Sequence, residues 1–490
     1  MLKKNIFFNL VLTISQILFP LITFPYASRI LGPSGIGSIV FVDSITQIFL
    51  LFSALGIPIY GVREISKLKH DKLAISNLLS ELLTIHMCCT GLFILFYLGL
   101  ALFIPQLSAH FLLVLIGVAI LIFNVFSLEW FFQGIENFSY ITKRTLIVRI
   151  VFIILLFCFV SKKTDTVVYY SLMAGSSFLN AIINFNYSRR YVNGLRVSLN
   201  LRKHLKPLLI ILCSNIVISV YLLMDNTIVG FLKGEVAVGY YSTAVKFAKV
   251  ALTIITSFGI VLIPQISKAH TVKDYDRVNV IVNKSFNYVC TIGLPLTIGL
   301  ILLSKTIILT LVSKAFLPSV LVLQIISPIL IIIGMTNIFV WQVLTPFGKD
   351  KKVLFIVICG MLTSLTFNFL LIPHWSYLGA AVANVVTELV VMVLSAYYVY
   401  SLNLIKFKLT PLWNAIFGSL GLILITIILR VTISESLIRE ILIVVLCGIL
   451  YSIYQILIVK NEIIVSVFKA VTTKISDLSL SFNKQYNKRK

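Results

Sequence analysis

The feature that most constrains the fold of this chain is a series of long apolar runs that continues from one end to the other. Each run holds roughly 18 to 26 residues, enough for an α-helix to cross the hydrocarbon core of a bilayer. They predict an all-α polytopic membrane protein with about fourteen transmembrane helices. The runs lie near residues 6–27, 36–56, 79–104, 108–128, 144–161, 166–187, 208–230, 237–262, 283–304, 318–345, 350–373, 376–402, 411–430 and 437–459.

The positions of the basic residues orient these helices. The chain has 41 Lys and Arg residues against 17 Asp and Glu residues, a formal charge of +24. With the N-terminus in the cytoplasm, 30 of the 41 fall in cytoplasmic connections or the basic tail, and 8 fall on the other side. Because basic residues are enriched in cytoplasmic connections, we expect both termini in the cytoplasm. The charge suits an anionic inner leaflet and requires no nucleic acid.

Three basic residues remain within the predicted spans, and two of them share a helix. They are Arg149, Lys246 and Lys249. Ser242 and Thr253 extend the lysine pair with a 4-3-4 spacing, which places all four side chains on one helical face. A charge near the bilayer centre needs water or a counter-charge. This face therefore predicts either a water-filled cavity or a buried ion pair.

The first predicted span has a similar polar face. Asn9, Thr13 and Gln16 follow a 4-3 spacing, and Pro20 continues it. We expect this face, with Gln47 from the second span, to line the same cavity as the lysines. Proline removes a backbone hydrogen bond and kinks a helix, which could be a moving gate or a fixed bend.

Three acidic residues also lie within spans, namely Asp43, Asp225 and Glu388. Intramembrane carboxylates commonly mark ion pathways, so these residues are candidates for H⁺ or Na⁺ coupling or for gating. Asp43 and Lys246 occupy nearly equivalent positions of a repeat described below, which makes a latch or a structural pair between them a further candidate. No P-loop, metal-ligand spacing or nucleophile motif is present, so we expect no catalytic residue, no bound metal and no cofactor beyond a coupling ion.

A weak internal repeat divides the chain. Gly32 and Gly37 correspond to Gly234 and Gly239 at an offset of 202 residues, at equivalent points of the predicted topology. The offset aligns spans 1–6 with spans 7–12, and six is even, so the repeat is parallel. The predicted domains are an N-lobe at 1–206, a C-lobe at 207–405, and two extra helices with a basic tail at 406–490.

Three phrases are recognisable together: FPYASRILGPSGIG (24–37), LGIPIYGVREISK (55–67) and EWFFQGIENFSYITKRTLIVRI (129–150). As a set they resemble the Wzx-type polysaccharide flippases, the polysaccharide transport family of the multidrug/oligosaccharidyl-lipid/polysaccharide (MOP) exporter superfamily. The resemblance implies a MATE-like fold with two six-helix lobes around a central cavity. It also implies the substrate, an oligosaccharide repeat unit on undecaprenyl diphosphate. Such proteins move it from the inner to the outer leaflet of the bacterial cytoplasmic membrane by alternating access, for O-antigen or capsule synthesis.

The same resemblance assigns roles to the intramembrane cations. Lys246 and Lys249 are expected to contact the diphosphate or acidic sugars, and Arg149 to meet the headgroup from the cytoplasmic side or to reach back to that surface. Arg29 is expected at the outer gate or as a helix anchor. A polysaccharide polymerase and a chain-length regulator are expected partners.

Three alternatives remain open from the sequence: a lipid II flippase, a MATE-type multidrug or ion antiporter, and a membrane polysaccharide polymerase. Central lysines disfavour an exporter of organic cations, and short outer connections disfavour a polymerase.

Overall fold

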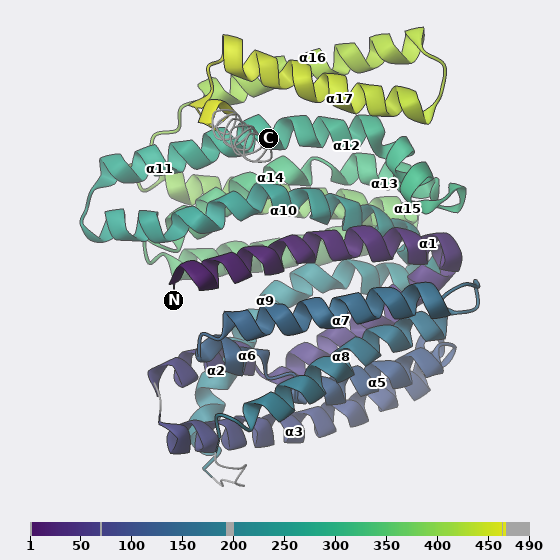
Figure 1. Ribbon diagram of the computed structural model, residues 1–490, viewed down its shortest axis with the longest axis vertical. Coiled ribbons are helices and arrows are strands. Elements are labelled where there is room, and N and C mark those ends of the chain that lie inside the picture. The colour runs from purple at the N-terminus through teal and green to yellow at the C-terminus, as the bar shows by residue number, and fades with distance from the viewer. Residues whose placement is uncertain (1, 69–70, 193–199, 463, 467–490) are drawn as a thin grey trace, which may run out of the picture. The chain divides into compact units, whose positions relative to one another are not determined.

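The computed structural model describes residues 2–68, 71–192, 200–462 and 464–466 (Figure 1). Inside the helices it leaves undescribed the side chains of residues 2–10, 13, 214, 217, 218, 220–222, 260 and 261. Throughout the described ranges the regular structure is helical, without any strand, so the predicted all-α class is confirmed.

The helices are α1 (Leu2–Ala54), α2 (Ile57–Lys67), α3 (Lys72–Phe103), α4 (Pro105–Ser108), α5 (Phe111–Val125), α6 (Glu129–Gly134), α7 (Phe138–Phe159), α8 (Thr166–Ser188), α9 (Arg202–Lys233), α10 (Glu235–Thr271), α11 (Tyr275–Tyr288), η1 (Val289–Gly293), α12 (Leu294–Ile307), η2 (Ile308–Val312), η3 (Lys314–Phe316), α13 (Pro318–Ile326), α14 (Ile329–Asn337), η4 (Ile338–Leu344), α15 (Asp350–Tyr400), α16 (Thr410–Thr432), α17 (Leu437–Ile453) and η5 (Tyr454–Ile458). Each predicted span falls mostly within these helices. Ten helical stretches among the described residues are long and apolar enough to cross a membrane, and two of them, α1 and α15, each contain two predicted spans. The number of about fourteen crossings stays a prediction.

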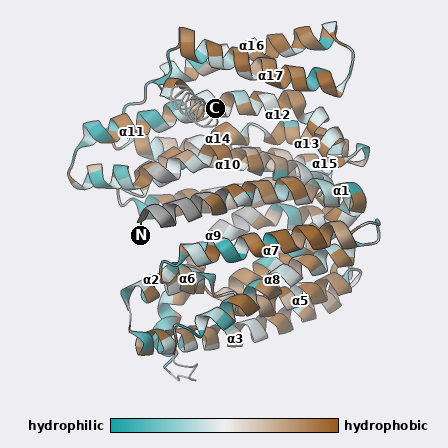
Figure 2. Cartoon of the chain, in the orientation of Figure 1, coloured by the Kyte–Doolittle hydropathy of each residue, from teal (hydrophilic) through white to brown (hydrophobic). Residues whose placement is uncertain are grey.

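Apolar side chains cover much of the helical surface, as Figure 2 shows for α5, α16 and α17. Large hydrophobic residues are strongly exposed, including Phe103 at 87% and Leu95 at 70%. A surface of this kind is stable only in contact with lipid or another apolar partner. The chain is a multi-pass membrane protein.

The predicted repeat reappears as a repeated backbone break. Gly32 interrupts α1 with φ 71° and ψ −177°, and Gly234 ends α9 with φ 79° and ψ 177°. Glycine adopts this conformation without the steric cost that a side chain would add. Two residues separated by 202 positions therefore turn the chain in the same way, which supports the repeat.

The two breaks bring the following helical segments into backbone contact. A Cβ atom on Gly37 would lie 1.7 Å from the carbonyl oxygen of Glu235, and one on Gly239 would lie 2.1 Å from that of Pro33. Residues 33 and 235, like 37 and 239, are related by the repeat offset. The second half of α1 and the start of α10 thus cross with approximate two-fold symmetry.

The chain forms two compact units. The first comprises Met1–Val250, Ile307–Ile326 and Lys351–Leu394, and the second comprises Ala251–Thr306, Ser327–Asp350 and Ser395–Lys490. In the first unit α1 packs against α7 and α9, and α5 packs against α8; in the second α16 packs against α17. The predicted boundaries at residues 206 and 405 stay a prediction.

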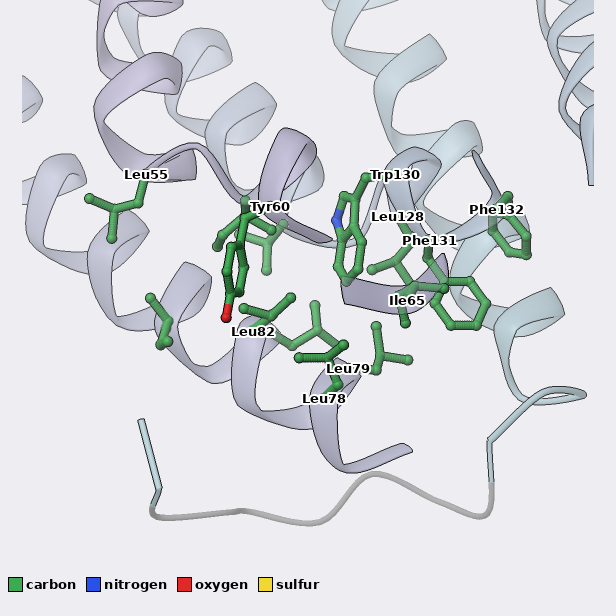
Figure 3. Close-up of a cluster of buried hydrophobic side chains, with 14 of the residues drawn as sticks. Leu55, Tyr60, Ile65, Leu78, Leu79, Leu82, Leu128, Trp130, Phe131 and Phe132 are labelled. Carbon is green, nitrogen blue, oxygen red and sulfur yellow. The ribbon is translucent and has the colours of Figure 1, made fainter. Parts of the chain in front are cut away.

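Two of the recognised phrases interlock within the first unit. A Cβ atom on Gly61 would lie 2.2 Å from the Trp130 ring, and one on Gly134 would lie 2.7 Å from Ile65. Figure 3 shows Trp130, Ile65 and Tyr60 in the buried cluster that α2 and α6 share with α3. These phrases therefore specify close packing of α2 on α6.

The glycine crossing gives a test of the fold. Gly37→Ala and Gly239→Ala should each lower the melting temperature of the purified protein by several degrees, because the new methyl group meets backbone atoms that cannot yield cheaply and overpacking costs about 1–3 kcal/mol. Gly91→Ala is the matched control, since nothing lies within 4 Å of a Cβ atom there. Equal melting temperatures for the three variants would show that the crossing is not tightly packed.

Candidate functional site

Lys246 and Lys249 of α10 both have exposed side chains. Lys246 Nζ lies 4.5 Å from the centroid of the Phe24 ring on α1, within the range of a cation–π interaction. Ser242, one turn earlier, is buried, and its hydroxyl donates to the carbonyl of Gly239 at 3.4 Å. Thr253 is half-buried and lies in the part of α10 that belongs to the second unit. The predicted polar face is thus open at the lysines and packed at Ser242.

No ion pair within 4 Å joins Asp43 to Lys246 among the described residues, so a latch or a structural pair between them stays a prediction. Asp43 Oδ1 instead accepts from the hydroxyl of Tyr170 at 3.2 Å and from Gln47 Nε2 at 3.4 Å. The Tyr170 hydroxyl also donates to Thr46 at 3.3 Å. Neutral donors from α8 and from its own helix satisfy the Asp43 carboxylate, while an aromatic ring covers the ammonium of Lys246.

Arg149 and Gln16 meet at a pocket of about 280 Å³ in the first unit, lined from α1, α6, α7 and α8. Arg149 Nη1 donates to the hydroxyl of Ser15, and its guanidinium lies 5.4 Å from the centroid of the Phe19 ring. The predicted partners Asn9 and Thr13 lie on the same helix, but their side chains are outside the described residues.

Arg144 lines the same pocket and was missed from the sequence. Its side chain is buried, and Nη2 lies 3.4 Å from Glu129 Oε2 and 3.0 Å from Thr145 Oγ1. Its Nε and Nη1 atoms have no hydrogen-bond partner among the described groups. Arg144 stands at the edge of the predicted span 144–161 and was counted with the cytoplasmic connection. No sequence pattern indicated that its side chain is buried. The pocket therefore holds two guanidinium groups and one carboxylate.

Arg29 is engaged by backbone carbonyls. Its Nε donates to Leu311 O at 3.1 Å and to Val312 O at 2.9 Å, and its Nη2 donates to Thr310 O. These carbonyls end η2, where a positive charge is favourable. Arg29 thus joins α1 to η2 and lies apart from the lysines.

Asp225 lies at the centre of a buried polar cluster. Its carboxylate accepts from the Tyr241 hydroxyl at 2.6 Å, from Asn368 Nδ2 at 2.8 Å and from Asn384 Nδ2 at 2.9 Å. The two asparagines lie eight residues on either side of Ser376, where α15 bends with φ 51°. Folding α15 back at this residue brings both amides to the same carboxylate.

The carboxylate of Asp225 is not balanced by a cationic side chain among the described residues. Among the described residues Asp225 has no Lys, Arg or His partner, and Asn368 Oδ1 has no donor. Glu388 is also buried, one turn beyond Asn384 on α15. A buried carboxylate without a counter-charge is costly, and oxygen atoms suit a proton or a hard cation. A role of this cluster in ion coupling stays a prediction.

Two further polar contacts join segments far apart in the sequence, and the first of them joins the two predicted lobes. Glu235, at the start of α10, pairs with His110 Nε2 at 2.9 Å and accepts from the hydroxyl of Ser34. At α2, α3 and α9, His204 Nε2 lies 2.7 Å from Glu81 Oε2, and its Nδ1 lies 2.8 Å from the Tyr60 hydroxyl. No sequence pattern indicated these contacts, because the residues that meet lie more than 120 positions apart in the chain.

Comparison with known proteins decides the family. Residues 2–270, more than half of the chain, match the family described as "Polysaccharide biosynthesis protein". The chain belongs to this family. Residues 211–370 also match the family described as "MatE".

Relatives and solved structures extend over most of this polysaccharide biosynthesis protein. A "Putative O-antigen transporter" of Escherichia coli (strain K12) is 24% identical, with 81% of this chain and 96% of the relative covered. One of the same name from Shigella dysenteriae is 21% identical, with 80% and 98% covered. The fold resembles "Lipid II flippase MurJ, inward closed conformation", with a TM-score of 0.78 at 15% identity over 94% of this chain and all of that one. It also resembles an inward-facing multidrug resistance MATE family transporter of the MOP superfamily, with a TM-score of 0.62 at 14% identity over 81% and 98%.

The family match confirms the predicted polysaccharide family, and the solved structures confirm the predicted MATE-like fold. Both relatives are named as transporters, which supports transport rather than catalysis for this member of the family. The polar groups described above are therefore candidates for substrate contact, ion coupling and gating.

Proposed function

We propose that this protein is a flippase for undecaprenyl-diphosphate-linked oligosaccharide repeat units, moving them from the inner to the outer leaflet of the cytoplasmic membrane. The carrying observation is the pair of exposed lysines on α10, an otherwise apolar membrane helix. The names of the two relatives support an O-antigen or similar surface glycan as the cargo.

The chemistry of the substrate fits these cations. A lipid-linked diphosphate is strongly anionic, and a cation in a low-dielectric surrounding attracts it more strongly than a cation in bulk water. Lys246 and Lys249 would contact the diphosphate, and Arg149 with Arg144 offers a second cationic position on α7.

Alternating access would use the contacts between lobes. In this proposal the contact of Glu235 with His110 and Ser34 belongs to the outer closure. The hydrogen bonds from Arg29 of α1 to the carbonyls of η2 belong to it as well. This assignment follows the predicted orientation, with both termini in the cytoplasm and the protein in the inner membrane. A polysaccharide polymerase and a chain-length regulator remain the predicted partners.

The Asp225 cluster would couple transport to an ion gradient. Its carboxylate, its two asparagines and the nearby Glu388 supply oxygen atoms at membrane depth, as in secondary transporters driven by Na⁺ or H⁺. The orphan Asn368 Oδ1 favours Na⁺, because a metal ion could be bound by that oxygen and by Asp225 together.

Deleting the gene should abolish one surface polysaccharide and leave its lipid-linked repeat units on the cytoplasmic leaflet. The measurement is the surface glycan profile together with the amount of protected lipid-linked oligosaccharide in inside-out vesicles. Peptidoglycan synthesis should continue unchanged. Loss of peptidoglycan synthesis with a normal surface glycan would instead favour a lipid II flippase, and normal levels of both would contradict the proposal.

Lys246→Gln and Lys249→Gln should each reduce glycan export in a complemented deletion strain by roughly tenfold or more, because a hydrogen bond to a charged group is worth about 1.5–3 kcal/mol. Lys314→Gln is the matched control, since Lys314 is exposed on η3 and lies apart from the α10 face. Protein amounts in the membrane should be equal. Similar export by all three variants would remove the lysines from the mechanism.

Asp225→Asn should abolish ion-dependent stabilisation of the purified protein. If Na⁺ binds the cluster, the melting temperature of the wild type should be higher in NaCl than in KCl, because a ligand of the folded state stabilises it by mass action. The variant should show no such difference. A wild type that responds to pH but not to Na⁺ would identify H⁺ as the ion, and a response to neither would contradict coupling at Asp225.

A further inference from the structure

A polar groove of about 620 Å³ lies in the second compact unit, and its lining includes none of the residues assigned to transport. The groove has two adjoining walls, α11 and residues 406–414, which run from the connection into the start of α16. Residues Val459 to Glu462, after η5, close one end. All these segments adjoin connections that the charge distribution places on the cytoplasmic side.

Asparagine side chains on α11 fix the shape of the groove. Asn279 accepts from Lys406 N at 2.9 Å and donates to Leu404 O at 2.8 Å. Asn283, one turn later, accepts from Lys408 N at 2.8 Å and donates to Lys406 O at 2.8 Å. Each amide replaces a missing backbone partner of the extended segment. The lysines of this wall are therefore held at defined positions instead of on a loose connection.

Positive charge predominates along the groove. Four exposed lysines line it, and none forms an ion pair with a described residue: Lys284, Lys406, Lys408 and Lys460. Two carboxylates, Asp276 and Glu462, and several asparagine side chains also reach the lining. The lining thus offers cations for an anionic group and oxygen acceptors for hydroxyl groups.

An apolar stripe continues from this groove along α16. Leu409, Trp413, Phe417, Leu420 and Leu424 follow helical spacing and are all exposed, Trp413 at 56% and Phe417 at 61%. Figure 2 shows the hydrophobic character of α16. Exposed tryptophan next to a polar region is typical of the membrane interface. The groove therefore lies where a headgroup would sit, and the stripe lies where its acyl chains would run.

We propose that this groove binds an anionic glycerophospholipid of the inner leaflet. The phosphodiester would contact Lys406 and Lys408, with Lys284 and Lys460 nearby. Hydroxyl groups of the headgroup would donate to asparagine or carboxylate oxygens, and the acyl chains would lie against Trp413 and Phe417. Basic pockets on the cytoplasmic side of membrane proteins recognise anionic headgroups in this way. The combination of phosphate and hydroxyl groups makes phosphatidylglycerol the best-matched class.

The test measures lipid retention by the full-length protein in native mass spectrometry after delipidation and addition of dioleoylphosphatidylglycerol. Lys406→Gln/Lys408→Gln should weaken retention by roughly tenfold, because two charge-assisted contacts are lost. The matched control, Lys268→Gln/Lys273→Gln, removes the same charge from two exposed lysines of the same unit that do not line the groove. Equal retention by the two double variants would overturn the proposal.

Two further probes identify the source of the phosphate. Dioleoylphosphatidylcholine should bind much more weakly than the anionic lipid, and glycerol 3-phosphate should not compete at equal concentration, because it lacks acyl chains. Trp413→Ala should weaken the binding of the anionic lipid and leave any binding of glycerol 3-phosphate unchanged. Equal binding of both lipids, or full competition by glycerol 3-phosphate, would contradict a lipid site. Equal melting temperatures of the lipid-free variants establish that each is folded. Asn283→Ala removes the hydrogen bonds that hold the backbone of Lys406 and Lys408. This variant should therefore weaken lipid retention without removing a charge.

Discussion

The crossing of α1 and α10 at Gly37 and Gly239 is the contact on which the rest of the first unit depends. The two backbones touch there, so each helix dictates the position of the other within a few tenths of an ångström. Two turns further along, the same approach places Lys246 beside Phe24. On the other side of the crossing it places Glu235 beside Ser34. A side chain at either glycine would separate these groups together.

The glycines of the recognised phrases serve helix packing, while Arg144 and Arg149 of the third phrase line the pocket at α7. Residues 24–37 contain the break at Gly32 and the crossing at Gly37, while residues 55–67 and 129–150 interlock through Gly61 and Gly134. Arg29, the charged residue of the first phrase, bonds backbone carbonyls. The phrases that indicate the family therefore lie largely in closely packed parts of the helices. Lys246, Lys249 and the Asp225 cluster lie outside these phrases.

The sequence could predict what depends on length, period and local charge. Apolar runs marked the helices, the 4-3-4 spacing marked the lysine face of α10, and the rarity of intramembrane acids marked Asp225. It could not predict which groups meet across the fold. Asp43 and Lys246 were paired by the repeat offset, but Tyr170 reaches Asp43 from α8, more than 120 positions away. The burial of Arg144 could not be predicted for a related reason. It depends on where α7 begins and on the helices packed around it, and not on the residues next to it in the sequence.

The repeat is symmetric in its backbone and asymmetric in its charges, and this asymmetry explains how one frame can hold two different sites. The equivalents of Asp225 and Lys246 at the offset of 202 are Thr23 and Ser44. Ser44 bonds Thr227 at 3.0 Å, a neutral contact across the crossing of α1 and α9. Its repeat partner Lys246 makes the corresponding approach to α1 beside Phe24, with a full positive charge. A charge in a membrane needs a partner that comes and goes if it is to act in transport. The C-terminal repeat places charges at positions where the N-terminal repeat has hydroxyl groups, of which Ser44 bonds across to α9 and Thr23 bonds the Phe19 carbonyl of its own helix.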